Sequence, residues 1–196
     1  LAQQHSKTSP TEYVALMDTL ARSGRLDPVF ENLPLAEEVF ARGFTRPELA
    51  VLMAHAKMYV KAALLGTAAL TDPRAQTLLT SQFPPEIAEQ HALWLQDHPL
   101  RQEIIATGAA NEMVHTMGPG FVFEMTGQTG RSLSDVVLAW WATSEILDIG
   151  STIAQLEASD DRSTDVQDDA MLNLMRLGRR VTRWLLKAHD QIVVND

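Results

Sequence analysis

Apolar side chains recur at spacings of three and four residues along almost the whole chain, the pattern of helices that bury one face. Tyr13, Leu16 and Leu20 follow this pattern in the first segment. Proline, glycine and capping residues divide the chain into successive segments. The expected helical segments are residues 10–24, 26–43 (one or two short helices), 45–65, 72–79, 84–95, 100–117, 132–147, 153–156 and 168–188.

Strand signals are almost absent. A half-buried strand alternates apolar and polar residues, and only Phe121-Val122-Phe123 suggests one, over three residues. We therefore predict an all-α fold, an irregular multi-helix bundle of about seven to nine helices with no significant sheet. Residues 1–196 are expected to form a single helical domain. Residues 157–169, EASDDRSTDVQDD, are expected to form an acidic flexible linker before the last helix.

The clearest helix start is Thr45-Arg46-Pro47-Glu48. Thr45 can cap the helix, Glu48 can accept a hydrogen bond from the cap amide, and a proline in the first turn sacrifices no hydrogen bond. In the helix that follows, only Lys57 and Lys61 mark a solvent-exposed side. Because the remaining sides are apolar, we expect this helix to be buried on most of its surface.

Composition narrows the classes of function. The 196-residue chain has a net charge of -9, which argues against general affinity for nucleic acid or anionic membranes, because both require a positive field. It contains no cysteine, so disulfides, thiolate catalysis and cysteine-ligated metals are excluded, and the cytoplasm is the expected compartment. The longest apolar run, residues 49–65, is interrupted by charged residues, so no transmembrane span is predicted.

Glu112 and His115 have the Glu-x-x-His spacing of carboxylate-bridged metal sites in helical bundles. Such a site needs a second pair and two further glutamates, and the chain has no second pair. We therefore expect Asn111 and His115 to be buried polar groups bonded to neighbouring helices, with Glu112 facing a cation or water.

Gly118-Pro119-Gly120 follows the helix expected over residues 100–117 and suggests a phosphate-binding loop. A helix precedes these glycines and no lysine follows them, whereas a phosphate loop requires Gly-Lys-Ser/Thr. Gly118 suits the position just after a helix, and Pro119 prevents the helix from continuing. We therefore expect a turn.

Other reactive residue types form no recognisable set. No nucleophile elbow supports a Ser-His-Asp triad. The remaining histidines show no metal-ligand spacing: His5, His55, His91, His98 and His189. The acidic stretch lacks the glycine and terminal glutamate of a calcium loop, so its aspartates are expected to be solvated: Asp160, Asp161, Asp165, Asp168 and Asp169. We predict no catalytic, cofactor-binding or metal-binding residue in this chain.

The last helix carries the one set of residues that core packing does not explain. Basic side chains gather opposite its apolar stripe: Arg176, Arg179, Arg180, Arg183 and Lys187. This face could dock on an anionic surface, or it could be a solvated face partly paired with the acidic stretch before it. If the domain joins subunits, this face is our first candidate for a contact.

An ordered set of motifs resembles the large bacterial NAD-specific glutamate dehydrogenases. The motifs are Gly24-x-Leu26-Asp27, residues 43–52 (GFTRPELAVL), 54–57 (AHAK), 83–85 (FPP), 100–107 (LRQEIIAT), 111–114 (NEMV), 118–123 (GPGFVF) and 182–186 (TRWLL). They cover nearly the whole chain, and the ordered set is specific although no single motif is. Two positions depart from the family pattern: His115, where asparagine is expected in many relatives, and Gly120, where serine or threonine is expected.

The resemblance implies that this chain is the helical C-terminal part of a much longer enzyme, and residues 1–4 resemble the chain just after the catalytic domain. The parent would oxidatively deaminate L-glutamate to 2-oxoglutarate and ammonia with NAD. Its nucleotide-binding fold and catalytic residues would lie upstream, so this part is expected to hold no cofactor and to be inactive alone. The implied role is structural, subunit-contact or regulatory. Its implied partners are its own catalytic domain and the other subunits of a homo-oligomer.

Two alternatives stay open at this point. A free-standing helical interaction module would act through the basic face of residues 176–187, and an open reading frame beginning near Leu1 would favour it. A helical metal enzyme centred on Glu112 and His115 would contain stoichiometric iron, manganese or zinc.

Overall fold

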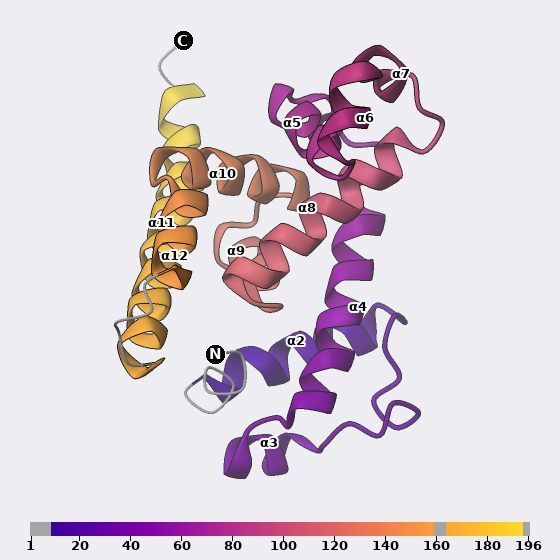
Figure 1. Ribbon diagram of the computed structural model, residues 1–196. Helices are drawn as coiled ribbons and strands as arrows, with labels where there is room; N and C mark the ends of the chain where they lie inside the picture. The colour runs from indigo at the N-terminus through magenta and orange to yellow at the C-terminus, as the bar shows by residue number, and fades with distance from the viewer. Residues whose placement is uncertain (1–8, 159–163, 194–196) are drawn as a thin grey trace.

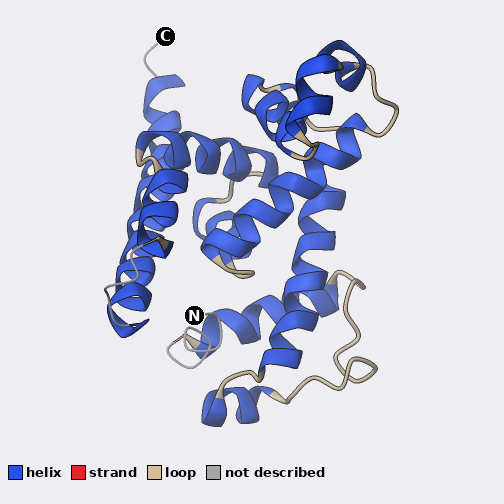
Figure 2. Ribbon diagram, viewed as in Figure 1, coloured by secondary structure: helices blue, strands red, loops and turns tan. Residues whose placement is uncertain are grey.

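The structure, a computed structural model, describes residues 9–158 and 164–193, and in these ranges the chain is helical with no strand (Figure 1, Figure 2). The helices are α2 (Pro10–Arg22), α3 (Ala36–Arg42), α4 (Arg46–Leu64), the short 3-10 helix η1 (Ala68–Thr71), α5 (Pro73–Ser81), α6 (Pro85–Gln90), α7 (Ala92–Gln96), α8 (Arg101–Met117), α9 (Phe121–Thr129), α10 (Leu133–Ile146), α11 (Ile149–Glu157) and α12 (Thr164–Val193). The all-α prediction is confirmed. The eleven α-helices described exceed the expected number.

Two hydrophobic cores organise the helices, and α4 belongs to both. The main core contains buried residues of η1, α5 and α7 to α12, together with Val60 and Leu64 of α4. The N-terminal core contains buried residues of α2 and α3, together with Leu49, Leu52 and Ala56 of α4. Figure 1 shows α4 running from α2 and α3 at one end to α5 at the other. The helix that the sequence predicts to be buried on most sides is thus the element common to both cores.

Local start and stop signals act as the sequence predicts. At the start of α4, the Thr45 amide donates a hydrogen bond to the Glu48 carboxylate at 2.7 Å. At the start of α10, the Ser132 amide donates to the Asp135 carboxylate at 3.2 Å in the same arrangement. At the end of α8, Gly118 adopts a φ of 85°, which favours glycine because it has no Cβ.

Residues 121–123, the only strand-like run of the sequence, form the first turn of α9. Phe121 and Val122 are buried in the main core, and the Phe121 ring contacts the Trp140 ring at a centroid distance of 5.7 Å. Tertiary burial therefore overrides the β propensity of these residues. The predicted helix over residues 84–95 is also divided, because α6 and α7 are separate helices that meet at His91.

The last helix begins earlier than expected, at Thr164 instead of Asp168. Acidic side chains near a helix N-terminus interact favourably with the helix dipole, which explains why the aspartates of this stretch extend the helix. Residues 164–169 of the predicted linker are therefore helical, whereas residues 159–163 lie outside the described part of the chain. Helix α11 likewise extends beyond the expected residues 153–156.

Helix α12 packs closely on the main core at a small residue. A Cβ on Gly178 would lie 3.2 Å from the Met117 Cε and 3.5 Å from the Trp140 ring, so glycine lets the helices approach. One turn further, the buried hydroxyls of Thr182 and Thr143 are hydrogen-bonded at 3.0 Å. None of the described helices, α12 included, combines the length and apolarity needed to cross a membrane.

Candidate functional site

The basic face of α12 divides into an inward and an outward part. The Arg179 side chain is 11% exposed and turns toward α2 and α9. It donates hydrogen bonds to the Glu124 carboxylate, to Glu12 Oε1 at 3.1 Å and to the Met117 carbonyl at 2.8 Å. Its guanidinium also lies 5.7 Å from the centre of the Phe121 ring. Because a desolvated cation requires partners, this set of contacts fixes α12 against three other helices.

Arg183 joins the same cluster, with Nη2 3.4 Å from Glu124 Oε1. Arg176, Arg180 and Lys187 are instead exposed. The inward arginines therefore pair with carboxylates of α2 and α9, which lie far from them in the sequence, and no local pattern could reveal this. Only the three outward residues remain available on the predicted docking face, and docking through them stays a prediction.

Gly120 allows α2 to reach this cluster. A Cβ at position 120 would lie 2.7 Å from Glu12 Cγ and 3.0 Å from Glu12 Cδ, and it would overlap the carboxylate. The backbone at Gly120 has an ordinary φ of -81°, so the need is for space and not for conformational freedom. The departure from the serine or threonine expected here is thus matched by the position of Glu12. The glycines lie at a helix junction, as the turn interpretation of this stretch predicts.

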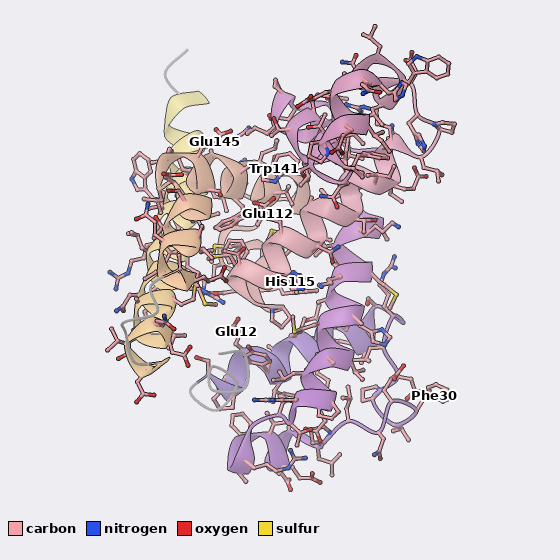
Figure 3. All side chains as sticks on the ribbon, viewed as in Figure 1. Glu12, Phe30, Glu112, His115, Trp141 and Glu145 are labelled. Carbon is pink, nitrogen blue, oxygen red and sulfur yellow. The ribbon has the colours of Figure 1, made fainter. Side chains whose placement is uncertain are left out.

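Glu112 and His115 lie in different surroundings on α8 (Figure 3). His115 is exposed, and its Nε2 lies 2.7 Å from Lys57 Nζ of α4. Partial burial and the charge of Lys57 lower the pKa of His115. The prediction that His115 is buried is therefore wrong, although it does bond to a neighbouring helix. Among the residues that the structure describes, no three histidine or acidic side chains are grouped so that they could hold a metal ion.

Glu112 lines a cleft of about 280 Å³ between α5, α8 and α10, beside Trp141 and Glu145 (Figure 3). Burial raises the pKa of the Glu112 carboxyl. Arg74, which also lines the cleft, is held by Asp72, to which its Nε and Nη2 donate at 2.7 and 2.8 Å. Burial thus favours the protonated form of Glu112, and the same cleft is also lined by the Glu145 carboxylate and the Ser81 and Ser144 hydroxyls.

A second depression, which we call the α10–α12 groove, has a volume of about 360 Å³ and a mainly apolar lining. Trp184 forms one wall and is 66% exposed. The rest of the lining is apolar except for two charged side chains, Arg131 and Asp135, and its apolar members are Leu138, Ala139, Ala142, Leu185, Leu186 and Ala188. The exposed Arg180 and Lys187 lie four residues before and three residues after Trp184, which places both beside it on the helix surface.

A tight turn between α2 and α3, residues 27–33, presents the two most exposed large apolar side chains of the described residues, and we call it the apolar turn. Val29 is 89% and Phe30 is 84% exposed. Figure 3 labels Phe30 at the outer edge of the molecule. Their amides donate to Asp27 Oδ1 at 3.0 and 3.1 Å. On the α4 side, His55 Nε2 lies 3.2 Å from the Glu31 carboxylate. These contacts hold the tip in one shape while its apolar side chains face solvent.

A third apolar surface lies at α7. Leu93 and Trp94 are each 76% exposed, whereas the next residue, Leu95, is 4% exposed and belongs to the main core. The buried leucine anchors the short helix, and its neighbours project outward. We call Leu93 and Trp94 the α7 tip.

The helices arranged around α4 define an all-helical class of domain, with several apolar surfaces on its exterior. The chain belongs to the family described as "Glutamate dehydrogenase, C-terminal", whose model matches residues 41–195. The resemblance drawn from the ordered motifs is therefore confirmed.

Relatives of this chain are NAD-specific glutamate dehydrogenases. The protein of Pseudomonas aeruginosa is 34% identical over 194 residues, which cover 96% of this chain and 12% of the relative. The protein of Halomonas elongata is 32% identical over 202 residues, which cover 100% of this chain and 12% of the relative. The protein of Mycobacterium tuberculosis is 31% identical over 166 residues, which cover 82% of this chain and 10% of the relative. The chain thus spans about an eighth of the length of the first two relatives.

Proposed function

We propose that this chain is the non-catalytic C-terminal helical domain of an NAD-dependent glutamate dehydrogenase and acts there as a contact domain. It packs against the rest of its own polypeptide and against other subunits. The parent converts L-glutamate, NAD and water to 2-oxoglutarate, ammonia and NADH, with NAD and the catalytic residues held upstream of this domain. A cytoplasmic location is part of the same proposal, and the cysteine-free sequence of this domain is compatible with it.

The observation that carries this proposal is the display of large aromatic side chains on well-anchored elements. Phe30, Trp94 and Trp184 are 84%, 76% and 66% exposed. Aromatic residues are enriched at protein interfaces, where a few of them contribute most of the binding energy. Because each is held by a hydrogen-bonded turn or a packed helix, little conformational freedom is lost on contact.

We assign the α7 tip to the contact with the rest of the polypeptide. Its two neighbouring apolar side chains carry no charge, and the helix that bears them is fixed by Leu95. Burying a large apolar side chain contributes about 1.5–3 kcal/mol. The two side chains together could therefore stabilise the docked domain by about 3–6 kcal/mol before the costs of association.

Amide hydrogen exchange of residues 91–98 tests this assignment. We expect slower exchange in the full-length enzyme than in the isolated 196-residue chain, because docking covers the α7 tip. In the full-length enzyme, Trp94→Ser should restore fast exchange, whereas Ile146→Ser, at a comparably exposed position, should not. Equal exchange rates in the two unmodified proteins would remove the assignment, and glutamate oxidation by the isolated chain would remove the non-catalytic role.

A further inference from the structure

We propose that the apolar turn of one copy of this chain docks in the α10–α12 groove of a second copy. This inference rests on the proposed contact role and names one of its partners. It uses surfaces separate from the α7 tip, so the two contacts can be tested independently. The partner is a second copy because the chain carries both a convex apolar surface next to carboxylates and a concave, mainly apolar surface next to the exposed cations of α12.

The apolar turn is a preformed convex surface. Val29 and Phe30 lie side by side at its tip, and the hydrogen bonds of both amides to Asp27 hold them there. The contact of Glu31 with His55 fixes the turn to α4. Large apolar side chains that remain exposed on a rigid tip mark an interaction site, because their display to water gives the isolated fold no benefit.

The α10–α12 groove is a concave surface of suitable size. Its volume of about 360 Å³ provides space for apolar side chains, and its lining includes three alanines, Ala139, Ala142 and Ala188. Trp184 also lines it and is largely exposed. A groove lined by an aromatic side chain and small apolar residues is the kind of pocket in which an aromatic anchor is desolvated on binding.

The charges around the two surfaces are opposite. Residues 27–38, which contain the apolar turn, include four carboxylates and no cation, and two of these carboxylates, Glu31 and Glu38, lie beside His55 and Arg42. On the α12 side of the groove, residues 176–187 include five cations and no carboxylate, whereas the rest of the lining adds one cation, Arg131, and one carboxylate, Asp135. Arg179 and Arg183 are paired inside the molecule, but Arg180 and Lys187 remain exposed beside Trp184. Such complementary fields speed association and select one orientation, and salt weakens them.

The two surfaces cannot meet within one copy. Figure 1 shows α10 and α12 on one side of the molecule and the connection between α2 and α3 on the opposite side, where Figure 3 labels Phe30. The contact is therefore heterologous, with the turn of each copy directed at the groove of the next. Such contacts form rings when the rotation closes and open chains when it does not.

Sedimentation velocity of the 196-residue chain at increasing concentration tests the contact. We expect reversible self-association that weakens as sodium chloride is raised. Phe30→Ser and Trp184→Ser should each weaken the association constant about tenfold or more, the effect of removing a central anchor. Phe40→Ser and Leu100→Ser, at exposed apolar positions outside the two surfaces, should leave it unchanged.

Mixing the two weakened variants separates this contact from every symmetric alternative. Phe30→Ser retains an intact groove and Trp184→Ser retains an intact turn, so the mixture should form dimers and no larger species. Failure of the mixture to associate would overturn the head-to-tail arrangement. A chain that stays monomeric, or equal association of Phe30→Ser and the unmodified chain, would show that the occupant is another part of the enzyme or another protein, and would overturn the proposal. The proposed contact role is tested separately, by hydrogen exchange at the α7 tip in the full-length enzyme, and neither result of the mixing experiment bears on that measurement.

Discussion

Replacing Arg179 by alanine is expected to lower the free energy of unfolding by about 3 kcal/mol, the lower end of the cost of removing one partner from a buried ion pair. The side chains of Arg179, Glu12 and Glu124 are 11%, 18% and 22% exposed, so both carboxylates would lose their most buried cationic partner, while Glu124 would keep its contact with Arg183. The variant also loses the hydrogen bond to the Met117 carbonyl, which contributes about 1 kcal/mol within this total.

Urea unfolding followed by circular dichroism measures this loss. The midpoint should fall while the m-value stays constant, because the surface exposed on unfolding hardly changes. Arg180→Ala provides the matched control, since Arg180 is the next residue of the same helix and is exposed. Its effect should stay within about 0.5 kcal/mol.

A double-mutant cycle with Glu124→Gln separates the ion pair from the loss of side-chain volume. We expect the double variant to be less destabilised than the sum of the single variants, by about 1–3 kcal/mol, because each single change already removes the ion pair between Arg179 and Glu124. If Arg179→Ala were no more destabilising than Arg180→Ala, the cluster would be no more than an exposed ion pair and the reasoning would be refuted.

Three further changes test other parts of the structure. Gly120→Ser should destabilise by about 1–3 kcal/mol in the same urea assay because the new side chain displaces Glu12, and Glu12→Ala should recover part of this loss. Glu48→Gln should cost about 1 kcal/mol at pH 7 by removing the pairing with Arg42. That pairing lowers the pKa of Glu48 from 4.5 to about 2, so the stabilisation is present above pH 4.5 and disappears as the pH falls toward 2. Glu112→Gln should have the opposite effect on stability. Burial raises the pKa of Glu112, so replacing the carboxylate by a neutral amide should raise the free energy of unfolding at pH 7. The difference between the variant and the unmodified chain should vanish in acid, where the native carboxyl is also neutral. For each glutamate, an effect that does not change with pH would contradict the stated cause.

Much of the fold could be predicted from the sequence because its signals are local. The Thr45 and Glu48 capping pair and Gly118 at the end of α8 each depend on residues within one turn of the chain. Helix α9 could not be predicted, because Phe121-Val122-Phe123 favours a strand locally and is helical only through its burial against other helices.

The candidate surfaces were less predictable, for the same physical reason. The basic face of α12 follows from helical spacing alone, but which of its members turn inward depends on Glu12 and Glu124, which lie 167 and 55 residues from Arg179. The apolar turn gives no periodic signal, since Val29 and Phe30 look like ordinary core residues until their exposure is known.

The position of helix α4 in both cores has a consequence for how the chain unfolds. Its hydrogen-bond ladder is continuous from the N-terminal core into the main core, so the loss of either core leaves half of the helix without the packing that stabilises it. Chains with two separate cores can lose them in succession. Here the shared helix should join the two cores into one cooperative unit. In a variant with Trp94 and Trp184 replaced by phenylalanine, the fluorescence of Trp140 and Trp141 in the main core and the total helicity should therefore change at the same denaturant concentration.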